Sequence, residues 1–141
     1  MHDTAQHLEE MAGFIAAYGL HTGDQFANCP PGGFMQLDIC ALAYYVTQDA
    51  TVPAAFFDDE GTASELIEAS EPAMACIRAI SAAIGNYEVP DTAGQPDLIE
   101  HVSQWTFTPP IGQQGPPSVD EVIGCILRAA QHVTTASTPA A

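Results

Sequence analysis

Apolar residues recur every three or four positions over most of this 141-residue chain, the pattern of helices that bury one face. The pattern predicts helices over residues 4–18, 62–69, 71–84, 96–106 and 119–133, with a short helical turn over residues 53–57. Gly19 and Gly85 stand where two of these helices should end, and Ser118 and Glu121 form a capping box before the last. The chain is therefore expected to be mainly α-helical.

The segment 39–46 differs from the others because it has no charged residue and is apolar on every side. A helix without a polar face is normally surrounded by other helices, so we expect this one at the centre of the domain. A buried strand is the competing interpretation, but the alanine content and the N-capping Asp38 favour a helix. Residues 24–37 lose the periodicity around Pro30-Pro31-Gly32-Gly33, which indicates an irregular loop or a short hairpin.

Together these patterns predict an all-α fold, a compact single-domain bundle of five to six helices around the central apolar helix. A chain of this length buries about 68–70% of its unfolded surface, which is enough for a core of its own. The domain is expected to span residues 1–133. Residues 134–141 contain little to bury and are expected to form a flexible tail.

The net charge of the chain indicates which classes of partner it can bind. The chain has only two basic residues, Arg78 and Arg128, against eighteen acidic ones, which gives a formal net charge of −16. Such a field disfavours phosphate backbones and anionic lipids and favours basic proteins or peptides. Salt adaptation is a competing explanation, although charged residues make up only 14% of the chain.

The acidic residues concentrate between residues 49 and 71, where seven occur without a base. An aromatic pair directly precedes three of them, as in interfaces where aromatic anchors bind and charges steer. The predicted partner-binding residues are Phe56, Phe57, Asp58, Asp59, Glu60, Glu65 and Glu68. A small acidic regulator, inhibitor or accessory subunit that docks a basic protein or peptide would have this pattern. The alternatives are a mimic of the DNA phosphate array and a solvated face that keeps the protein soluble.

A small-molecule-binding protein or enzyme is a further alternative. Its pocket would lie between the 38–46 helix and the helix that contains Trp105, and a lone guanidinium would bind an anionic group. The candidate ligand-binding residues are Arg78, Arg128, Trp105 and Tyr44.

Cysteine and histidine positions predict no metal site, no cofactor and no catalytic residue. His21, Cys29 and Cys40 offer three zinc ligands, but zinc-finger spacings and a fourth ligand are missing, so the thiols are interpreted as structural. A disulfide between Cys29 and Cys40 stays open. His7 and His101 are expected to be exposed, while His21 follows a helix C-terminus, where the dipole favours its charged form.

Several functional signatures are absent from the sequence. It has no phosphate-binding glycine loop, dinucleotide fingerprint, nucleophile elbow or zinc-helix motif, and no basic stripe for nucleic acid. The N-terminus lacks the pattern of a secretory signal, and no apolar run approaches the ~20 residues that span a bilayer. We therefore expect a cytoplasmic protein that binds neither nucleic acid nor membrane directly, with its oligomeric state open.

Four short segments carry a resemblance. They are Tyr18-Gly19-Leu20-His21-Thr22-Gly23, Cys40-Ala41-Leu42-Ala43, Trp105, and the closing stretch from Ser118-Val119-Asp120-Glu121-Val122 to Leu127-Arg128-Ala129-Ala130. In these the chain resembles an uncharacterised family of small helical proteins from actinobacteria and their phages. The resemblance implies a compact, mostly helical domain and supplies no functional residue.

Overall fold

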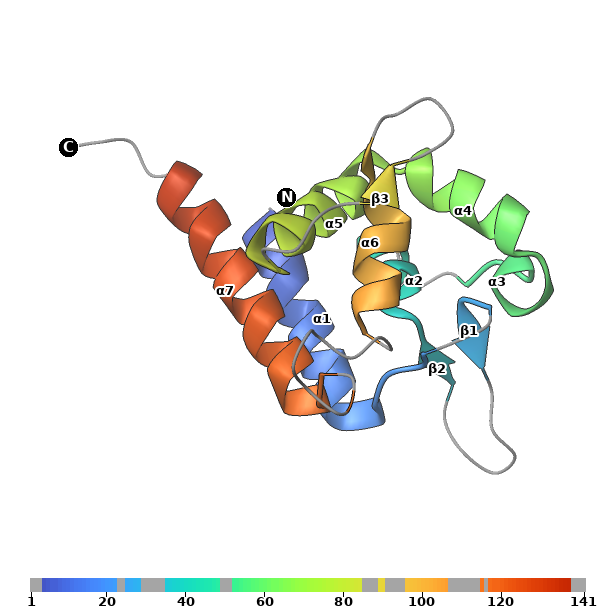
Figure 1. Ribbon diagram of the computed structural model, residues 1–141, viewed down its shortest axis with the longest axis horizontal. Coiled ribbons are helices and arrows are strands. Elements are labelled where there is room, and N and C mark those ends of the chain that lie inside the picture. Colours follow the sequence, from blue (N-terminus) through green and yellow to red (C-terminus); the bar gives the residue numbers. More distant parts are fainter. Residues whose placement is uncertain are drawn as a thin grey trace.

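The computed structural model describes residues 4–22, 25–28, 35–48, 52–84, 89–90, 96–106, 115 and 117–137. Its helices are α1 (Thr4–Tyr18), α2 (Ile39–Thr47), α3 (Ala55–Asp58), α4 (Glu60–Glu68), α5 (Glu71–Ile84), α6 (Leu98–Trp105) and α7 (Val119–Ser137) (Figure 1). The predicted mainly helical fold is confirmed. The described part contains seven helices, so the predicted number was low by one, because the short α3 forms a separate helix.

Helix α2 lies at the centre, as its apolar sequence predicts. Every residue from Ile39 to Ala43 is fully buried, and the helix contacts α1, α4, α5 and α6. Asp38 caps its N-terminus by accepting a hydrogen bond at Oδ1 from the backbone N–H of Cys40, at 2.8 Å. A helix that is surrounded by other elements has no face that meets solvent, which explains why the sequence of α2 is uniformly apolar.

Helices α1 and α7 lie side by side, and α5 packs against both (Figure 1). Leu8, Met11 and Ile15 of α1 meet Ile126 of α7 in the core, with each side chain at most 1% exposed. Full burial of side chains of this size stabilises a fold by about 1.5–3 kcal/mol each. The helical face predicted for residues 4–18 is therefore the face that holds α1 in the bundle.

Helix α7 is longer than predicted. It continues to Ser137, beyond the expected end at Val133, and the hydroxyl of Thr134 donates to the carbonyl of Ala130 at 3.0 Å. The remainder of the predicted tail, residues 138–141, lies outside the described residues.

A short antiparallel hairpin confirms the prediction for residues 24–37. Strands β1 (Ala27–Asn28) and β2 (Gln36–Leu37) pair with Ala27 opposite Leu37. Backbone hydrogen bonds attach the hairpin to its surroundings: Phe26 donates to the carbonyl of Phe56 at 2.9 Å, and Asp38 donates to that of Phe26 at 2.7 Å. The proline-glycine tip lies outside the described residues.

A second antiparallel pair, β3 (Val89–Pro90) and β4 (Pro96–Asp97), was not predicted. Pro96 was expected in the first turn of a helix, and that prediction is wrong. It lies in β4, and Asp97 caps α6 by accepting at Oδ1 from the N–H of Glu100 at 3.0 Å. A proline can precede an N-cap as well as follow it, so its presence alone did not fix the boundary.

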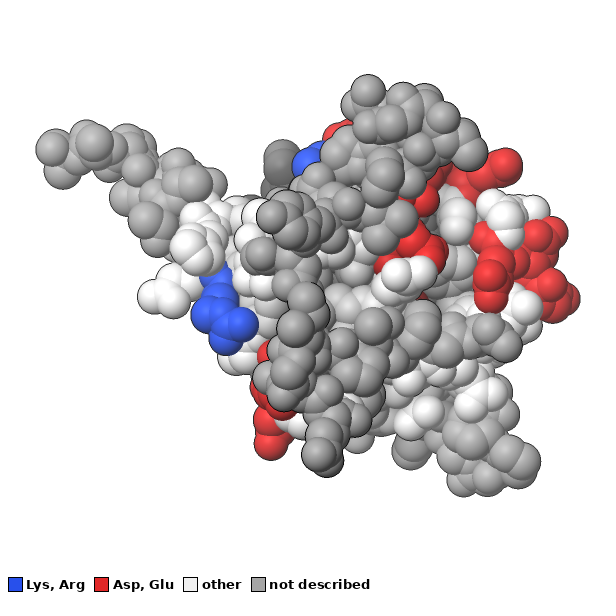
Figure 2. Space-filling view, in the orientation of Figure 1, with Lys and Arg blue, Asp and Glu red and all other residues white. Residues whose placement is uncertain are grey.

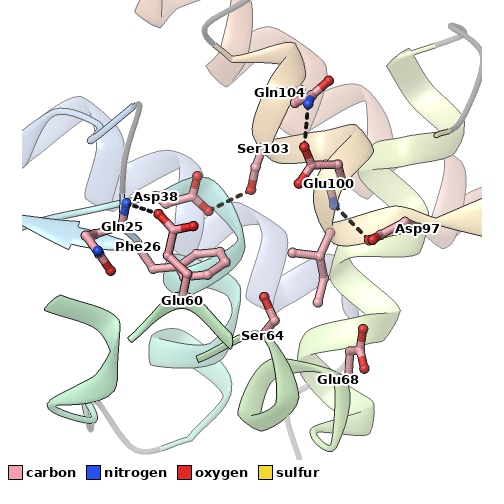
Figure 3. Close-up of a pocket in the computed structure, with 11 residues that line it drawn as sticks. Gln25, Phe26, Asp38, Glu60, Ser64, Glu68, Asp97, Glu100, Ser103 and Gln104 are labelled. Carbon is pink, nitrogen blue, oxygen red and sulfur yellow. Dashed lines mark hydrogen bonds between the residues drawn. The ribbon is translucent and has the colours of Figure 1, made fainter. Parts of the chain in front are cut away.

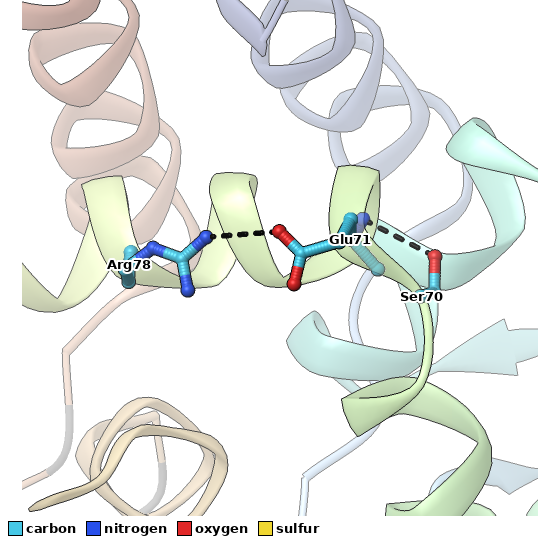
Figure 4. A network of polar contacts seen from close by, with 4 residues as sticks. Ser70, Glu71 and Arg78 are labelled. Carbon is cyan, nitrogen blue, oxygen red and sulfur yellow. Dashed lines mark hydrogen bonds and ion pairs between the residues drawn. The ribbon is translucent and has the colours of Figure 1, made fainter.

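Helices α4 and α5 are separated at Ser70. Its hydroxyl accepts from the N–H of Ala73 at 3.3 Å, which starts a new helix (Figure 4). The same hydroxyl accepts from the Gln48 side chain at 2.8 Å. Glu71 belongs to that helix and pairs with Arg78 at 3.7 Å (Figure 4). A single continuous row of carboxylates from α4 into α5, which would need an unbroken helix, does not form.

Candidate functional site

Between the hairpin, α4 and α6 lies a cavity of about 290 Å³, which we call the acidic pocket (Figure 3). Five carboxyl side chains line it, and no arginine or lysine does so among the residues the structure describes. The five are Asp38, Glu60, Glu68, Asp97 and Glu100. They come from three separate parts of the chain, so the tertiary fold creates this concentration of negative charge.

Glu60 forms the wall of the pocket nearest the hairpin. Its Oε1 accepts a hydrogen bond from the backbone N–H of Gln25 at 2.6 Å (Figure 3). Gln25 has a φ of 65°, in the left-handed region that costs a non-glycine residue about 1–2 kcal/mol. The hydrogen bond from Glu60 offsets part of this cost and joins the start of α4 to the base of the hairpin.

The first turn of α6 forms the opposite wall. Asp97 is the N-cap, and Glu100 lies one turn further, where its carboxylate accepts from the side chain of Gln104 (Figure 3). The N-terminus of a helix carries a partial positive charge that favours carboxylates. The dipole of α6 therefore holds two negative charges at the rim of the pocket.

Asp38 is the buried member of the set, with 3% of its surface exposed. Its Oδ1 accepts from the N–H of Cys40 at 2.8 Å and from the hydroxyl of Ser103 at 3.1 Å, which links α2 to α6. Burial raises the pKa of Asp38 to about 6, although these hydrogen bonds and the nearby His21 act in the opposite direction. One wall of the pocket thus changes charge in the weakly acidic range.

The cysteines that the structure describes are buried free thiols at positions 40, 76 and 125. Burial raises the pKa of Cys40 well above its usual value, with the Asp38 carboxylate as the next cause. Burial likewise raises the pKa of Cys76 to about 12 and that of Cys125, against the effect of Arg128. Such thiols stay protonated at neutral pH, which is the chemistry of structural cysteines. Cys40 is in no disulfide, and Cys29 lies outside the described residues.

Most predicted partner-binding residues are exposed. Asp58, Asp59, Glu60, Glu65 and Glu68 together form what we call the acidic face, over α3 and α4. Figure 2 shows it as the gathering of red side chains at the right. Glu60 and Glu68 also line the acidic pocket, so the face and the pocket are continuous. Asp59 has a structural role as well, because it caps α4 through Thr62 at 3.2 Å to the N–H and 2.8 Å to the hydroxyl.

The two predicted aromatic anchors differ. Phe57 is 39% exposed and remains available to a partner, whereas Phe56 is fully buried, so its prediction as a surface anchor is wrong. Its ring packs against Phe26 and Tyr44, with centroids 6.0 and 5.3 Å away. Consecutive residues of a helix point about 100° apart, so one ring of the pair enters the core and the other meets solvent.

The alternative ligand-binding residues do not form one site. Trp105 and Arg128 line a different cavity, of about 400 Å³, between α5, α6 and α7, and Asp120 and Glu121 line it too. Tyr44 packs on Phe56, and Arg78 pairs with Glu71. The cavity beside the N-terminus of α2 and α6 is the acidic pocket, which neither arginine lines. The acidic pocket therefore lacks the arginine that was predicted between these helices, and the ligand-binding alternative stays a prediction.

The expected exposure of His7 and His101 is also wrong, since they are 9% and 4% exposed. His101 Nδ1 lies 2.8 Å from the Ser81 hydroxyl, and this buried hydrogen bond joins α6 to α5. A signal was available in the sequence: Ser81 lies four residues after the buried Ile77, on the same face of α5, so a polar group was due in the core at that level. A buried hydroxyl requires a partner, and a neighbouring helix had to supply it.

Asp38, Asp97 and Glu100 are pocket residues that the sequence analysis missed. Asp38 was recognised as a cap, and its position directly before a fully apolar helix is the signal that its carboxyl group would be buried. Within the described residues no group of three or more histidine, cysteine or acidic side chains is placed to hold a metal ion. None of the described helices combines the length and hydrophobicity that crossing a membrane requires.

No family model, curated protein or solved structure matches the chain. The resemblance to the actinobacterial and phage family therefore stays a prediction. The geometry and charge of the acidic pocket and the acidic face are the observations that bear on function.

Proposed function

We propose that the acidic pocket and the acidic face together dock a basic segment of a partner protein, and that a lysine or arginine side chain of that segment enters the pocket. The observation that carries this proposal is the set of five carboxyl groups around one cavity with no basic residue facing them in the described part of the chain. Several of these carboxyl groups accept structural hydrogen bonds, but their proximity to one another is unfavourable because like charges repel. A cation in the pocket would be attracted by all of these carboxylates and would offset their mutual repulsion.

The walls of the pocket suit a long basic side chain. Phe26 and Ile99 supply apolar surface beside the carboxylates. Lysine and arginine bury their methylene stems along such surface while the charged head binds carboxylate oxygens. The volume of about 290 Å³ is near the lower limit of ligand pockets, which start at roughly 300 Å³, and it suits one side chain better than a large ligand.

The surface around the pocket supports a protein partner. Phe57 offers an exposed aromatic ring on α3, next to Asp58 and the start of α4. Interfaces commonly combine such a ring with charged residues at the rim, where the ring contributes affinity and the charges raise the association rate. Asp58 and Glu65 lie outside the pocket and serve this steering role.

The test compares two double variants that remove equal charge. Glu68→Gln with Glu100→Gln removes two of the five carboxyl groups of the pocket, whereas Glu9→Gln with Asp120→Asn removes two exposed carboxyl groups elsewhere. Glu100 and Asp120 both lie in the first turn of a helix, which matches their dipole effects. Asp59 is left intact in both variants because it caps α4.

The measurement is the affinity for hexalysine by titration calorimetry at low salt. We expect the pocket variant to bind about tenfold more weakly, or about 1.4 kcal/mol, and the control variant to lose less than about threefold. Equal losses in the two variants would show that only net charge matters. No detectable binding by the wild-type protein would contradict the proposal outright.

A further inference from the structure

Asp38 occupies an unusual position for a carboxyl group, because it is almost fully buried and yet forms part of the pocket wall. Hydrogen bonds from Cys40 and Ser103 hold it between α2 and α6, and its own N–H donates to the hairpin at Phe26. A change of charge at this one group acts on three elements that build the pocket.

The titratable groups around Asp38 are mostly acidic. Glu60 and Glu68 face it from α4, and Asp97 and Glu100 from α6. On its own element the neighbour is the buried Cys40 thiol, and His101 of α6 directs Nδ1 to Ser81 of α5. His21 favours the ionised form of Asp38, as do the hydrogen bonds from Cys40 and Ser103, and the backbone N–H of His21 donates to the carbonyl of Leu37, next to Asp38, at 3.0 Å.

We propose that Asp38 makes the acidic pocket sensitive to pH: loss of its proton weakens the fold and, at the same time, strengthens the attraction of the pocket for a cation. The second half of this inference rests on the proposed function. The first half concerns the folded protein alone.

The sign of the effect on stability follows from burial. Burial raises the pKa of Asp38 from 3.8 to about 6, so the folded protein holds a proton that the unfolded chain has already lost over that range. The contribution of Asp38 to the free energy of unfolding is therefore fully present below about pH 4 and is lost as the pH rises through about 6. The folding equilibrium constant falls by roughly 100-fold over this range, since each pH unit between the two pKa values contributes a factor of ten.

The sign of the effect on binding is the opposite. A cation in the pocket favours the ionised carboxylate, so it lowers the pKa of Asp38 and releases its proton. The affinity for a cation consequently rises with pH and becomes constant above about pH 7. The affinity of a ligand that binds only the ionised form changes by up to about tenfold between roughly pH 5 and 7.

The test of the first half is urea unfolding from about pH 4 to 7 for the wild type and Asp38→Asn. Asparagine keeps the acceptor for Cys40 and Ser103, and every other residue is the same in both proteins, so the difference between them isolates Asp38. We expect the ratio of the two folding constants to change by roughly 100-fold, in favour of Asp38→Asn at the higher pH. Asp59→Asn, at an exposed cap whose pKa is lowered by Thr62, should show almost no change over this range, because a lowered carboxyl pKa affects stability only below about pH 4. A ratio that is constant with pH for Asp38→Asn overturns the inference.

The second half is tested with hexalysine by calorimetry in two buffers of different ionisation enthalpy, at about pH 5.5. We expect wild-type binding to release close to one proton more than Asp38→Asn, with an affinity that rises toward pH 7. Binding of equal strength at each pH, without proton release, overturns the coupling and leaves the proposed function standing. If hexalysine binds neither protein, the proposed function and the coupling fail together, while the unfolding experiment still decides the first half.

Discussion

Phe56 and Phe57 are adjacent, identical in side chain and opposite in environment. Phe56 is fully buried against Phe26 and Tyr44, and its carbonyl accepts the hydrogen bond that attaches the hairpin. Phe57 is 39% exposed. Replacing each by alanine removes the same atoms from two very different places, so the pair tests the fold of the segment that bears the acidic face.

The magnitudes follow from burial. Truncating a fully buried phenylalanine to alanine costs about 3–5 kcal/mol, because transfer energy is lost and a cavity remains. With an unfolding entropy of about 2.1 cal/mol/K per residue, this corresponds to a decrease in Tm of roughly 10–17 °C for a chain of this size. For Phe57→Ala we expect a change in unfolding free energy within about 0.5–1 kcal/mol.

Urea unfolding followed by circular dichroism measures both variants on one scale, and Phe56→Leu provides a milder replacement if Phe56→Ala is too unstable to study. Hexalysine affinity, measured on the folded variants, should fall for Phe57→Ala and stay near the wild-type value for Phe56→Leu. Similar losses of stability for the two alanine variants would refute the assignment of Phe56 to the core. A larger loss of stability for Phe57→Ala would refute the orientation of α3.

Other variants test the polar contacts and the thiols. Ser103→Ala removes a hydrogen-bond donor that lowers the pKa of Asp38, so the pKa should rise. In urea unfolding the variant should therefore lose about 1 kcal/mol more stability at neutral pH than near pH 4. An equal loss of stability at both pH values would contradict the hydrogen bond. Asp59→Ala removes the cap of α4 and should lower the stability of the protein. Because hydrogen bonds lower the pKa of Asp59, this loss of stability should be present above about pH 4 and shrink below it. A loss of stability that grows on acidification would contradict this prediction. The three described cysteines should react with a thiol reagent only on unfolding, so fast labelling of more than one thiol in the folded protein would show that the buried set is wrong.

The helices could be predicted from the sequence because burial of one face leaves a local periodic pattern. The α5 boundaries, residues 71–84, and the cap at Asp38 both follow from residues within one turn of each other. Local signals did not distinguish Phe56 from Phe57, since a short helix offers too few positions to establish a face. The pairing of Ser81 with His101 required knowing that α5 packs against α6, which the sequence pattern does not contain.

The acidic pocket was only partly predictable for the same reason. The acidic residues of α4 are dense in the sequence and attracted notice, but the pocket also needs Asp38 from the α2 N-terminus and Asp97 and Glu100 from α6. These lie far apart along the chain, and tertiary packing alone brings them together. The charge of the site was therefore visible in the composition, whereas its location between α4 and α6 was not.

The most direct test of the central claim is an NMR titration of the wild-type protein with hexalysine at low salt, read residue by residue from the backbone amides. We expect the largest shifts around the pocket, in Gln25, Ser64, Glu68 and the stretch from Glu100 to Gln104, and no shift in the first turn of α7. Shifts spread evenly over every acidic segment, or concentrated at Asp120 and Glu121, would contradict it.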